Sequence, residues 1–137
     1  MLDANRKFPG LPYDGSDDPA IFQKYLGYGM EARSPNFAGA VAITKDEIVT
    51  YQGALVKTPY FNQSDGKTLS AQEVWGWTNT PYLVSVADPW CNGMTKSGHG
   101  VGLSGYGATK QAEEGKTYDE IIKYYYQGVV VQEMDFE

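Results

Sequence analysis

A glycine-rich segment constrains the fold more than any other part of the chain. Residues 98–108 read GHGVGLSGYGA and include five glycines and the only histidine, His99. Glycine costs backbone entropy, about 0.5–1 kcal/mol per residue relative to alanine, and it is favoured where φ is positive or where another group approaches the backbone closely. The segment therefore predicts a tight turn around His99, with a second backbone or a ligand packed against it.

Length and composition fit one globular domain. A chain of 137 residues buries about two-thirds of its unfolded surface. The expected order of elements is a helix, strands, helices and a last strand, which predicts a single α+β domain with a mixed or antiparallel sheet and a few short helices. Residues 1–29 are rich in proline and glycine, so we expect an irregular N-terminal segment packed on a body formed by residues 30–137.

Local patterns predict where the elements lie. Ser34 as N-cap and Pro35 in the first turn favour a helix that runs to about residue 45. Gln52-Gly53 predicts a hairpin turn between two strands. Ser-x-x-Glu and Thr-x-x-Glu capping boxes begin at Ser70 and Thr117 and predict two further helix starts. The remaining expected elements are a short helix near 19–25, strands at 47–51, 54–58, 60–63, 82–86 and 129–131, and a helix from about 104 to 114 that Gly115 ends.

Charge and cysteine content exclude several classes of protein. The net charge is −6 and no basic run is present, so nucleic acid is not an expected partner. One cysteine, Cys91, excludes an internal disulfide and a metal cluster built on paired cysteines. No apolar run reaches the roughly 18–20 residues of a membrane span. The first residues lack the apolar core of a signal peptide, so we expect a cytosolic protein or a piece of a longer one.

The glycine-rich segment holds three candidate functional residues. His99 has an unperturbed pKa near ~6.5 and suits an acid, a base or a hydrogen-bond donor, or else a buried histidine that holds the loop through a carbonyl. Ser104 and Tyr106 are expected at a helix N-terminus, where free N–H groups favour a polar or negative ligand. The alternative roles are a helix cap for the serine and core packing for the tyrosine.

Aromatic and acidic residues supply further candidates. Four aromatic residues, Trp75, Trp77, Tyr82 and Trp90, fall close together in the sequence and fit either a sugar-stacking groove or a core. Cys91 with His99 suits a cysteine hydrolase only weakly, because no residue that would orient the histidine is evident. Cleavage of a glycosidic bond needs a carboxylic acid with a raised pKa. None of the four candidates stands out as such an acid: Glu31, Asp65, Glu73 and Asp88.

Residues 27–131 resemble the stage II sporulation protein D family, which also includes the amidase enhancer proteins. The resemblance is carried in order by YFNQSDGKT at 60–68, SAQEVWG at 70–76, PYLVSVADPW at 81–90, the glycine-rich segment, and GKTYDEIIKYYYQG at 115–128. It implies an extracytoplasmic protein of the cell envelope that acts on peptidoglycan, either as a lytic transglycosylase that cleaves glycan strands or as an enhancer of a wall amidase.

The resemblance also implies what this chain lacks. In the lytic members a glutamate is the general acid and base, in a segment upstream of the matched region, and neither it nor the alanine-rich helix after it is found here. We therefore expect a C-terminal portion of such a protein, with its catalytic residue unknown and no cofactor. Some members bind zinc through cysteines and a histidine near residues 60–70, where this sequence has no cysteine, so no metal is expected.

Three hypotheses follow for the function. In the first, the chain is the substrate-groove part of a lytic transglycosylase, inactive by itself. In the second, it is a non-catalytic module that binds the cell wall or enhances an amidase. In the third, it is a structural fragment that folds only with its missing N-terminal half. The expected partners are glycan strands and a wall amidase or that missing half, and the expected substrate-binding residues are Trp75, Trp90, His99, Gly100, Ser104 and Tyr106.

Overall fold

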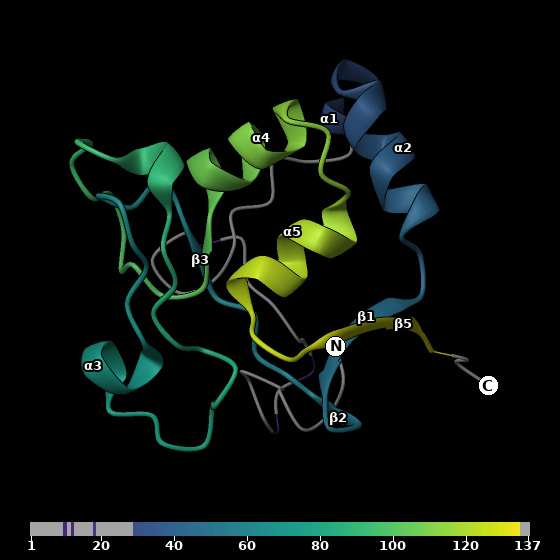
Figure 1. Cartoon of the computed structure of the whole chain (residues 1–137). Coiled ribbons are helices and arrows are strands. Elements are labelled where there is room, and N and C mark those ends of the chain that lie inside the picture. Colours follow the sequence, from purple (N-terminus) through teal and green to yellow (C-terminus); the bar gives the residue numbers. More distant parts are fainter. Residues whose placement is uncertain (1–9, 11, 13–17, 19–28, 135–137) are drawn as a thin grey trace. The chain divides into compact units, whose positions relative to one another are not determined.

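The computed structural model of the chain describes residues 10, 12, 18 and 29–134 (Figure 1). It consists of two compact units, Met1–Asp46 and Glu47–Glu137. The expected short helix near 19–25, and nearly all of the expected irregular segment at 1–29, lie outside the described residues. All described strands belong to the second unit, together with helices, and the α+β class is confirmed.

The first unit contains the helix expected after Ser34. Helix α1 spans Gly29–Arg33, and helix α2 spans Pro35–Ile43, which confirms the predicted element. The predicted cap is wrong, because the Ser34 side chain makes no capping hydrogen bond. Its carbonyl oxygen instead accepts from the N–H groups of Phe37 and Ala38, at 2.9 and 3.1 Å.

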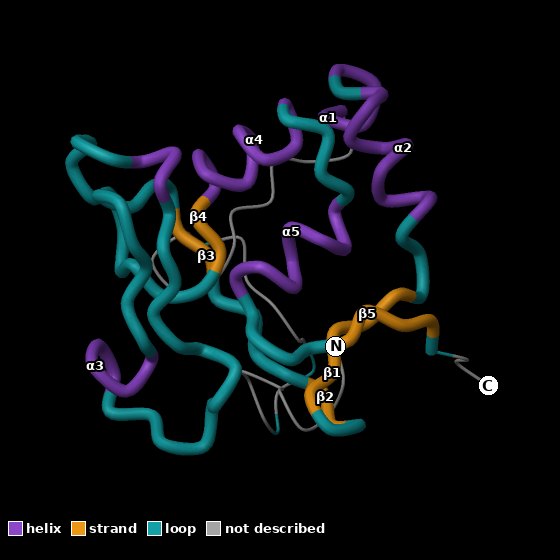
Figure 2. Tube along the Cα trace, in the orientation of Figure 1, coloured by secondary structure: helices purple, strands orange, loops and turns teal. Residues whose placement is uncertain are grey.

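The second unit contains a three-stranded antiparallel sheet (Figure 2). Strand β1 (Glu47–Tyr51) lies between β2 (Ala54–Leu55) and β5 (Val130–Glu133). Gln52 and Gly53 both have positive φ, 51° and 80°, as the predicted two-residue hairpin turn requires. The first and last strands of the described unit therefore lie side by side, with Val49 opposite Val131.

A second, two-stranded sheet supports the glycine-rich segment. Strand β3 (Tyr60–Phe61) pairs in parallel with β4 (Leu103–Ser104). The predicted strand at 60–63 is thus shorter than expected and does not join the hairpin. This pairing places Phe61 beside the segment that contains His99.

Both capping boxes predict helices correctly. Helix α3 (Ala71–Trp75) starts at the box of Ser70 and ends at Gly76, whose φ is +71°. Helix α5 (Tyr118–Tyr125) starts at the box of Thr117. Between them lie the 3-10 helix η2 (Pro89–Cys91) and helix α4 (Gly105–Glu113), which Gly115 follows with φ +89° as expected. None of the helices in the described part of the chain has the length and apolarity that a bilayer crossing needs.

The strand predicted at 82–86 is wrong. This stretch pairs irregularly with residues 66–71 instead of forming a regular ladder: the N–H of Ala71 donates to the carbonyl of Leu83 at 3.0 Å, and the N–H of Thr68 donates to the carbonyl of Val86 at 2.8 Å. The N–H of Leu83 donates to Thr80, whereas the N–H of Val86 donates to the hydroxyl of Thr68 at 2.9 Å. Leu83 is 2% exposed and fills the interior, whereas the β-branched Val84 is 39% exposed.

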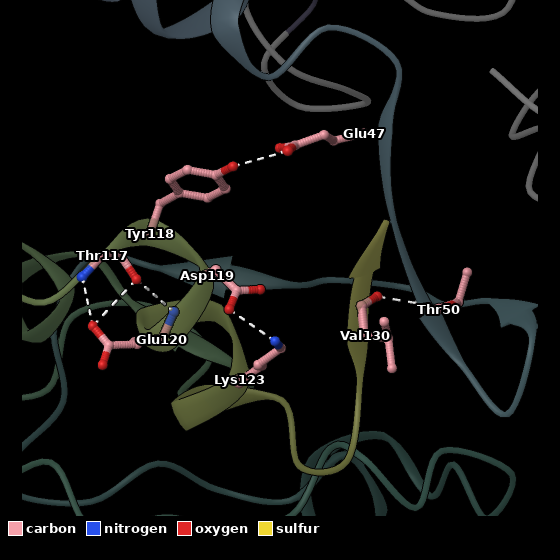
Figure 3. A network of polar contacts seen from close by, with 8 residues as sticks. All are labelled: Glu47, Thr50, Thr117, Tyr118, Asp119, Glu120, Lys123 and Val130. Carbon is pink, nitrogen blue, oxygen red and sulfur yellow. Dashed lines mark hydrogen bonds and ion pairs between the residues drawn. The ribbon is translucent and has the colours of Figure 1, made fainter. Parts of the chain in front are cut away.

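The core of the second unit forms where α5 meets the glycine-rich segment. Tyr125 and Val101 are fully buried there and belong to one cluster with Leu83 and Ala71. Polar contacts fasten the start of α5 to β1, as Figure 3 shows: the hydroxyl of Tyr118 donates to Glu47 at 2.8 Å. The turn around His99 is therefore built against a packed interior.

Candidate functional site

The glycine-rich segment forms a sharp turn with positive φ at alternate residues. Gly98, Gly100 and Gly102 have φ of +105°, +86° and +78°. A Cβ added at Gly98 would lie 2.8 Å from the Cβ of Phe61, and one at Gly102 would overlap the carbonyl oxygen of Pro59. The predicted close approach is confirmed, and the approaching group at these two glycines is the protein's own chain.

His99 lies in this turn as a half-buried ring with a defined tautomer. Its Nδ1 accepts from the N–H of Val101 at 3.1 Å, so the neutral ring carries its proton on Nε2. Burial lowers the pKa of His99 below its ordinary value, and the charge of Lys96 lowers it further, while a hydrogen bond with the Tyr60 backbone opposes both effects. His99 is therefore held neutral as an acceptor for the main chain.

A row of four rings runs from β3 to the segment after α3. We call Phe61, His99, Trp75 and Trp77 the ring row. The His99 ring centre lies 5.7 Å from that of Phe61 and 4.9 Å from that of Trp75, and Trp75 lies 4.7 Å from Trp77. The two tryptophans are each 36% exposed, and Phe61 is buried. The ring row thus joins the core to an exposed aromatic surface.

The ring row is flanked by lysines. The Nζ of Lys57 lies 4.8 Å from the centre of the Trp77 ring, within the range of a cation–π contact. Lys96 acts on His99 by its charge, and Lys67 acts in the same way on Glu73 of α3. Lys57 and Lys96 therefore bring positive charge to two rings of the row, in a chain whose net charge is −6.

The four aromatic residues that are close in sequence separate in space. Trp75 and Trp77 join His99, whereas Tyr82 is buried and packs against Tyr51 at 5.5 Å between ring centres. Trp90 packs edge-on against Tyr124, and its Nε1 donates to Glu114 at 2.8 Å. Trp75 and Trp90 therefore belong to two different aromatic groups.

Ser104 caps α4 from inside the protein. It is fully buried, its Oγ accepts from the N–H of Gly107 at 3.3 Å, and it lies 3.6 Å from the Sγ of Cys91. The N–H of Tyr106 donates to the carbonyl of Asn62 at 2.9 Å, so these two amides at the helix start have protein partners. Of the roles left open by the sequence, the cap is the one observed for Ser104, while the Tyr106 ring is 38% exposed rather than part of the core.

A buried polar network lies beside α4, the helix that follows the glycine-rich turn. Asp88 is fully buried, and its carboxylate accepts from the hydroxyls of Ser64 and Tyr125 at 2.7 and 3.0 Å. Burial, and then the charge of Asp88, raise the pKa of Tyr125. A Cβ added at Gly107 would overlap both the Asp88 carboxylate and the Tyr125 hydroxyl, so this glycine in α4 is required by the network.

Comparison with known proteins supports the resemblance stated above. No protein-family model matches the chain. It is 26% identical over 207 residues to stage II sporulation protein D of Bacillus subtilis (strain 168), covering 87% of this chain and 60% of that protein. Against stage II sporulation protein D of Bacillus amyloliquefaciens it is 26% identical over 214 residues, covering 90% and 62%. The chain is similar to stage II sporulation protein D.

A second similarity has a higher identity over a shorter stretch. The chain is 50% identical over 71 residues to the amidase enhancer of Bacillus subtilis (strain 168), which covers 52% of this chain and 10% of that protein. The chain spans about 60% of the length of the two stage II sporulation D proteins. Because those matches extend over 207 and 214 residues and this chain has 137, both relatives contain residues within the matched span that this chain lacks.

The described acidic residues near the site do not suit a general acid. Glu73 accepts from the N–H and the hydroxyl of Ser70 at 2.9 and 2.7 Å, and these hydrogen bonds lower its pKa, whereas an acid needs a raised one. Asp88 is held in the buried network, Asp65 is exposed, and the side chain of Glu31 lies outside what the structure describes. Among the described residues no group of three His, Cys, Asp or Glu side chains is placed to hold a metal ion.

Sequence reasoning missed two features of this region. The contact of Lys57 with Trp77 joins residues that lie in different predicted elements, and nothing local marks it. The buried role of Asp88 was also missed, because Asp88 was considered only as a candidate general acid. The available signal for this role was that Asp88, Pro89 and Trp90 lie in one of the stretches that carry the family resemblance. The substrate-binding roles of His99, Gly100, Ser104, Tyr106, Trp75 and Trp90 stay predictions.

Proposed function

We propose that this chain binds the glycan strands of peptidoglycan and that the ring row is its contact surface. The observation that carries the proposal is the exposed pair Trp75 and Trp77 stacked next to His99. Sugars present apolar C–H faces that pack against such rings, and nearby lysines supply polar contacts for hydroxyl and carboxylate groups. Similarity to proteins named for sporulation and for enhancing an amidase supports a ligand in the cell wall.

The proposed role is binding in the cell envelope, outside the cytoplasm, in support of another protein. A capping carboxylate with a lowered pKa, Glu73, is a poor source of the proton that glycosidic cleavage needs. We propose that the chain serves a wall amidase, and the 50% identity over 71 residues to an amidase enhancer favours this. The second candidate is the groove part of a lytic transglycosylase, favoured by the similarity to stage II sporulation protein D over 87% of the chain.

The binding proposal is tested with purified glycan strands and the full chain. Isothermal titration should show binding that Trp75→Ala weakens about tenfold, since an aromatic contact is worth about 0.5–1.5 kcal/mol beyond its buried area. Tyr118→Phe is the matched control, because Tyr118 is also an exposed aromatic residue but contacts Glu47. Equal loss in both variants, or none in Trp75→Ala, would overturn the assignment of the ring row.

The two candidates differ in what the bound chain does. An amidase-enhancing role predicts that adding the chain increases cleavage of peptidoglycan by a purified wall amidase and that Trp75→Ala reduces this increase. The groove part of a lytic transglycosylase should bind glycan strands but leave cleavage by the amidase unchanged, and it should release no anhydro-muropeptides by itself. Binding without any effect on the amidase would reverse the order of the two candidates, and release of anhydro-muropeptides by the chain alone would contradict both.

A further inference from the structure

His99 makes a hydrogen bond that protonation breaks and a ring contact that protonation leaves in place. Its Nδ1 accepts from the N–H of Val101 at 3.1 Å, and a protonated imidazole has no acceptor left. Its ring also lies 4.9 Å from that of Trp75, where a cationic ring is tolerated. Protonation therefore breaks the link to the turn while the ring stays among aromatic neighbours.

The charged groups around His99 favour the neutral ring. Lys96, three residues before it, opposes a second positive charge. Lys57 lies beside the far end of the ring row over Trp77. On α3, the carboxylate of Glu73 is engaged by Ser70 and faces Lys67, and on β3 the Tyr60 backbone forms a hydrogen bond with the His99 ring that favours its protonated form. Among residues 29–134 no carboxylate forms an ion pair with His99, and the hydrogen bond with the Tyr60 backbone is outweighed by burial of the ring.

The turn is coupled to the ring row and to the core. Val101 is fully buried, so its N–H requires a new partner once His99 ceases to accept. The carbonyl of Gly100 accepts from the N–H of Leu69 at 2.7 Å, just before α3, which carries Trp75. A change at residues 98–101 therefore affects Trp75 in two ways, through the hydrogen bond between Gly100 and Leu69 and through the contact of the His99 and Trp75 rings.

We propose that His99 is a pH-sensitive latch of the ring row, which holds the turn at 98–101 when neutral and releases the Val101 N–H when protonated in mild acid. The latch follows from the geometry of the turn alone. Its effect on ligand binding rests on the proposed function, because the same ring row is the proposed glycan surface. On release, the turn at 98–101 no longer fixes the position of the His99 ring beside Trp75, and glycan binding weakens.

The latch is tested by nuclear magnetic resonance on the full chain between pH 8 and pH 5. The single histidine makes the ring titration unambiguous. The expected result is that the Val101 amide signal shifts with the same midpoint as the His99 ring, and that this midpoint lies below the ordinary value of about 6.5. A Val101 amide that stays constant while His99 titrates would overturn the proposal.

Two variants separate the latch from general effects of acid. In His99→Asn the side-chain oxygen takes the place of Nδ1 as an acceptor and does not titrate, so the Val101 amide should not shift with pH. In His99→Ala the acceptor is missing, so the amide should already show the released position at pH 8. If His99→Ala does not fold, the Asn variant decides. An equal shift in wild type and His99→Asn would overturn the proposal.

Glycan titrations at pH 7.5 and pH 5.5 then test the regulatory consequence. Wild-type affinity should fall at the lower pH, and the affinity of His99→Asn should not change between them. Absence of glycan binding at both pH values would overturn the proposed function, while the amide titration would still decide the latch. Binding that does not depend on pH in wild type, alongside a shifting amide, would overturn the regulation of this site.

Discussion

At the residue scale, two positions carry most of the constraint on the site. His99 is fixed by an acceptor bond to the main chain and by ring contacts with Phe61 and Trp75. Gly107 is fixed by the buried network of Asp88 and Tyr125 beneath it. Both residues are contacted by side chains from elements that lie elsewhere in the sequence.

The lowered pKa of His99 predicts how stability depends on pH. The unfolded chain binds a proton near pH ~6.5, whereas the folded chain binds it only at lower pH. Stability should therefore be level above about pH 6.5 and should fall as the pH drops from there toward the folded pKa of His99. Urea unfolding at pH 7.5, 6.5 and 5.5 measures this. His99→Asn should remove the decrease, and a decrease that persists unchanged in that variant would contradict the assignment to His99.

Gly107→Ala is predicted to destabilise the chain by about 3 kcal/mol, because overpacking a buried site forces its neighbours to move. The added methyl group would overlap the Asp88 carboxylate and the Tyr125 hydroxyl, which are buried. Gly39→Ala is the matched control, since Gly39 lies in α2 with no atom within 4 Å of an added Cβ. Urea unfolding should show the control at or above wild-type stability. Similar free energies of unfolding for the two variants would argue against a tightly packed network around Gly107.

At the element scale, the short helices depend on their caps. Helix α5 has 8 residues, and its first turn is satisfied by the capping box of Thr117 and Glu120. Helix α3 has 5 residues and depends in the same way on Ser70 and Glu73. Helices of this length are marginal alone and are stabilised by packing. The caps determine where each helix begins, and packing against the core stabilises it.

Thr117→Ala is predicted to cost about 1 kcal/mol, because it removes the hydroxyl that accepts from the N–H of Glu120 at 3.3 Å. The measurement is the free energy of unfolding by urea. Thr109→Ala serves as the control, since the Thr109 hydroxyl is exposed and donates to Gly105 within α4. A loss at Thr109 equal to that at Thr117 would indicate that the box contributes nothing particular to α5.

At the scale of the whole molecule, the chain consists of two compact units that divide after Asp46. The second unit contains the described strands, the buried network and the ring row. It begins at β1, which pairs with β5 near the other end of the described chain. This closure joins the ends of the unit in one sheet.

We predict that residues 47–137 fold without the first unit and keep the ring row. Circular dichroism should show a cooperative unfolding transition, and the Val101 amide and His99 ring signals should match those of the full chain. The physical reason is that the contacts described for the core and the site lie within this unit. An unfolded or aggregated product would favour the hypothesis that the chain folds only with additional segments.

The sequence by itself determined the features that depend on a few neighbouring residues. The hairpin turn at Gln52-Gly53, the two capping boxes and the positive φ values around His99 were all predicted, because each is set by side-chain chemistry or glycine freedom within about four residues. The tertiary structure decided the rest. In the folded chain β3 pairs with β4, and residues 82–86 form no strand. Trp75 and Trp90 belong to different aromatic groups. The tertiary structure also buries Ser104 and brings Lys57 to Trp77. These contacts join residues far apart in the sequence, and packing of the whole core, which no local pattern encodes, selects among them.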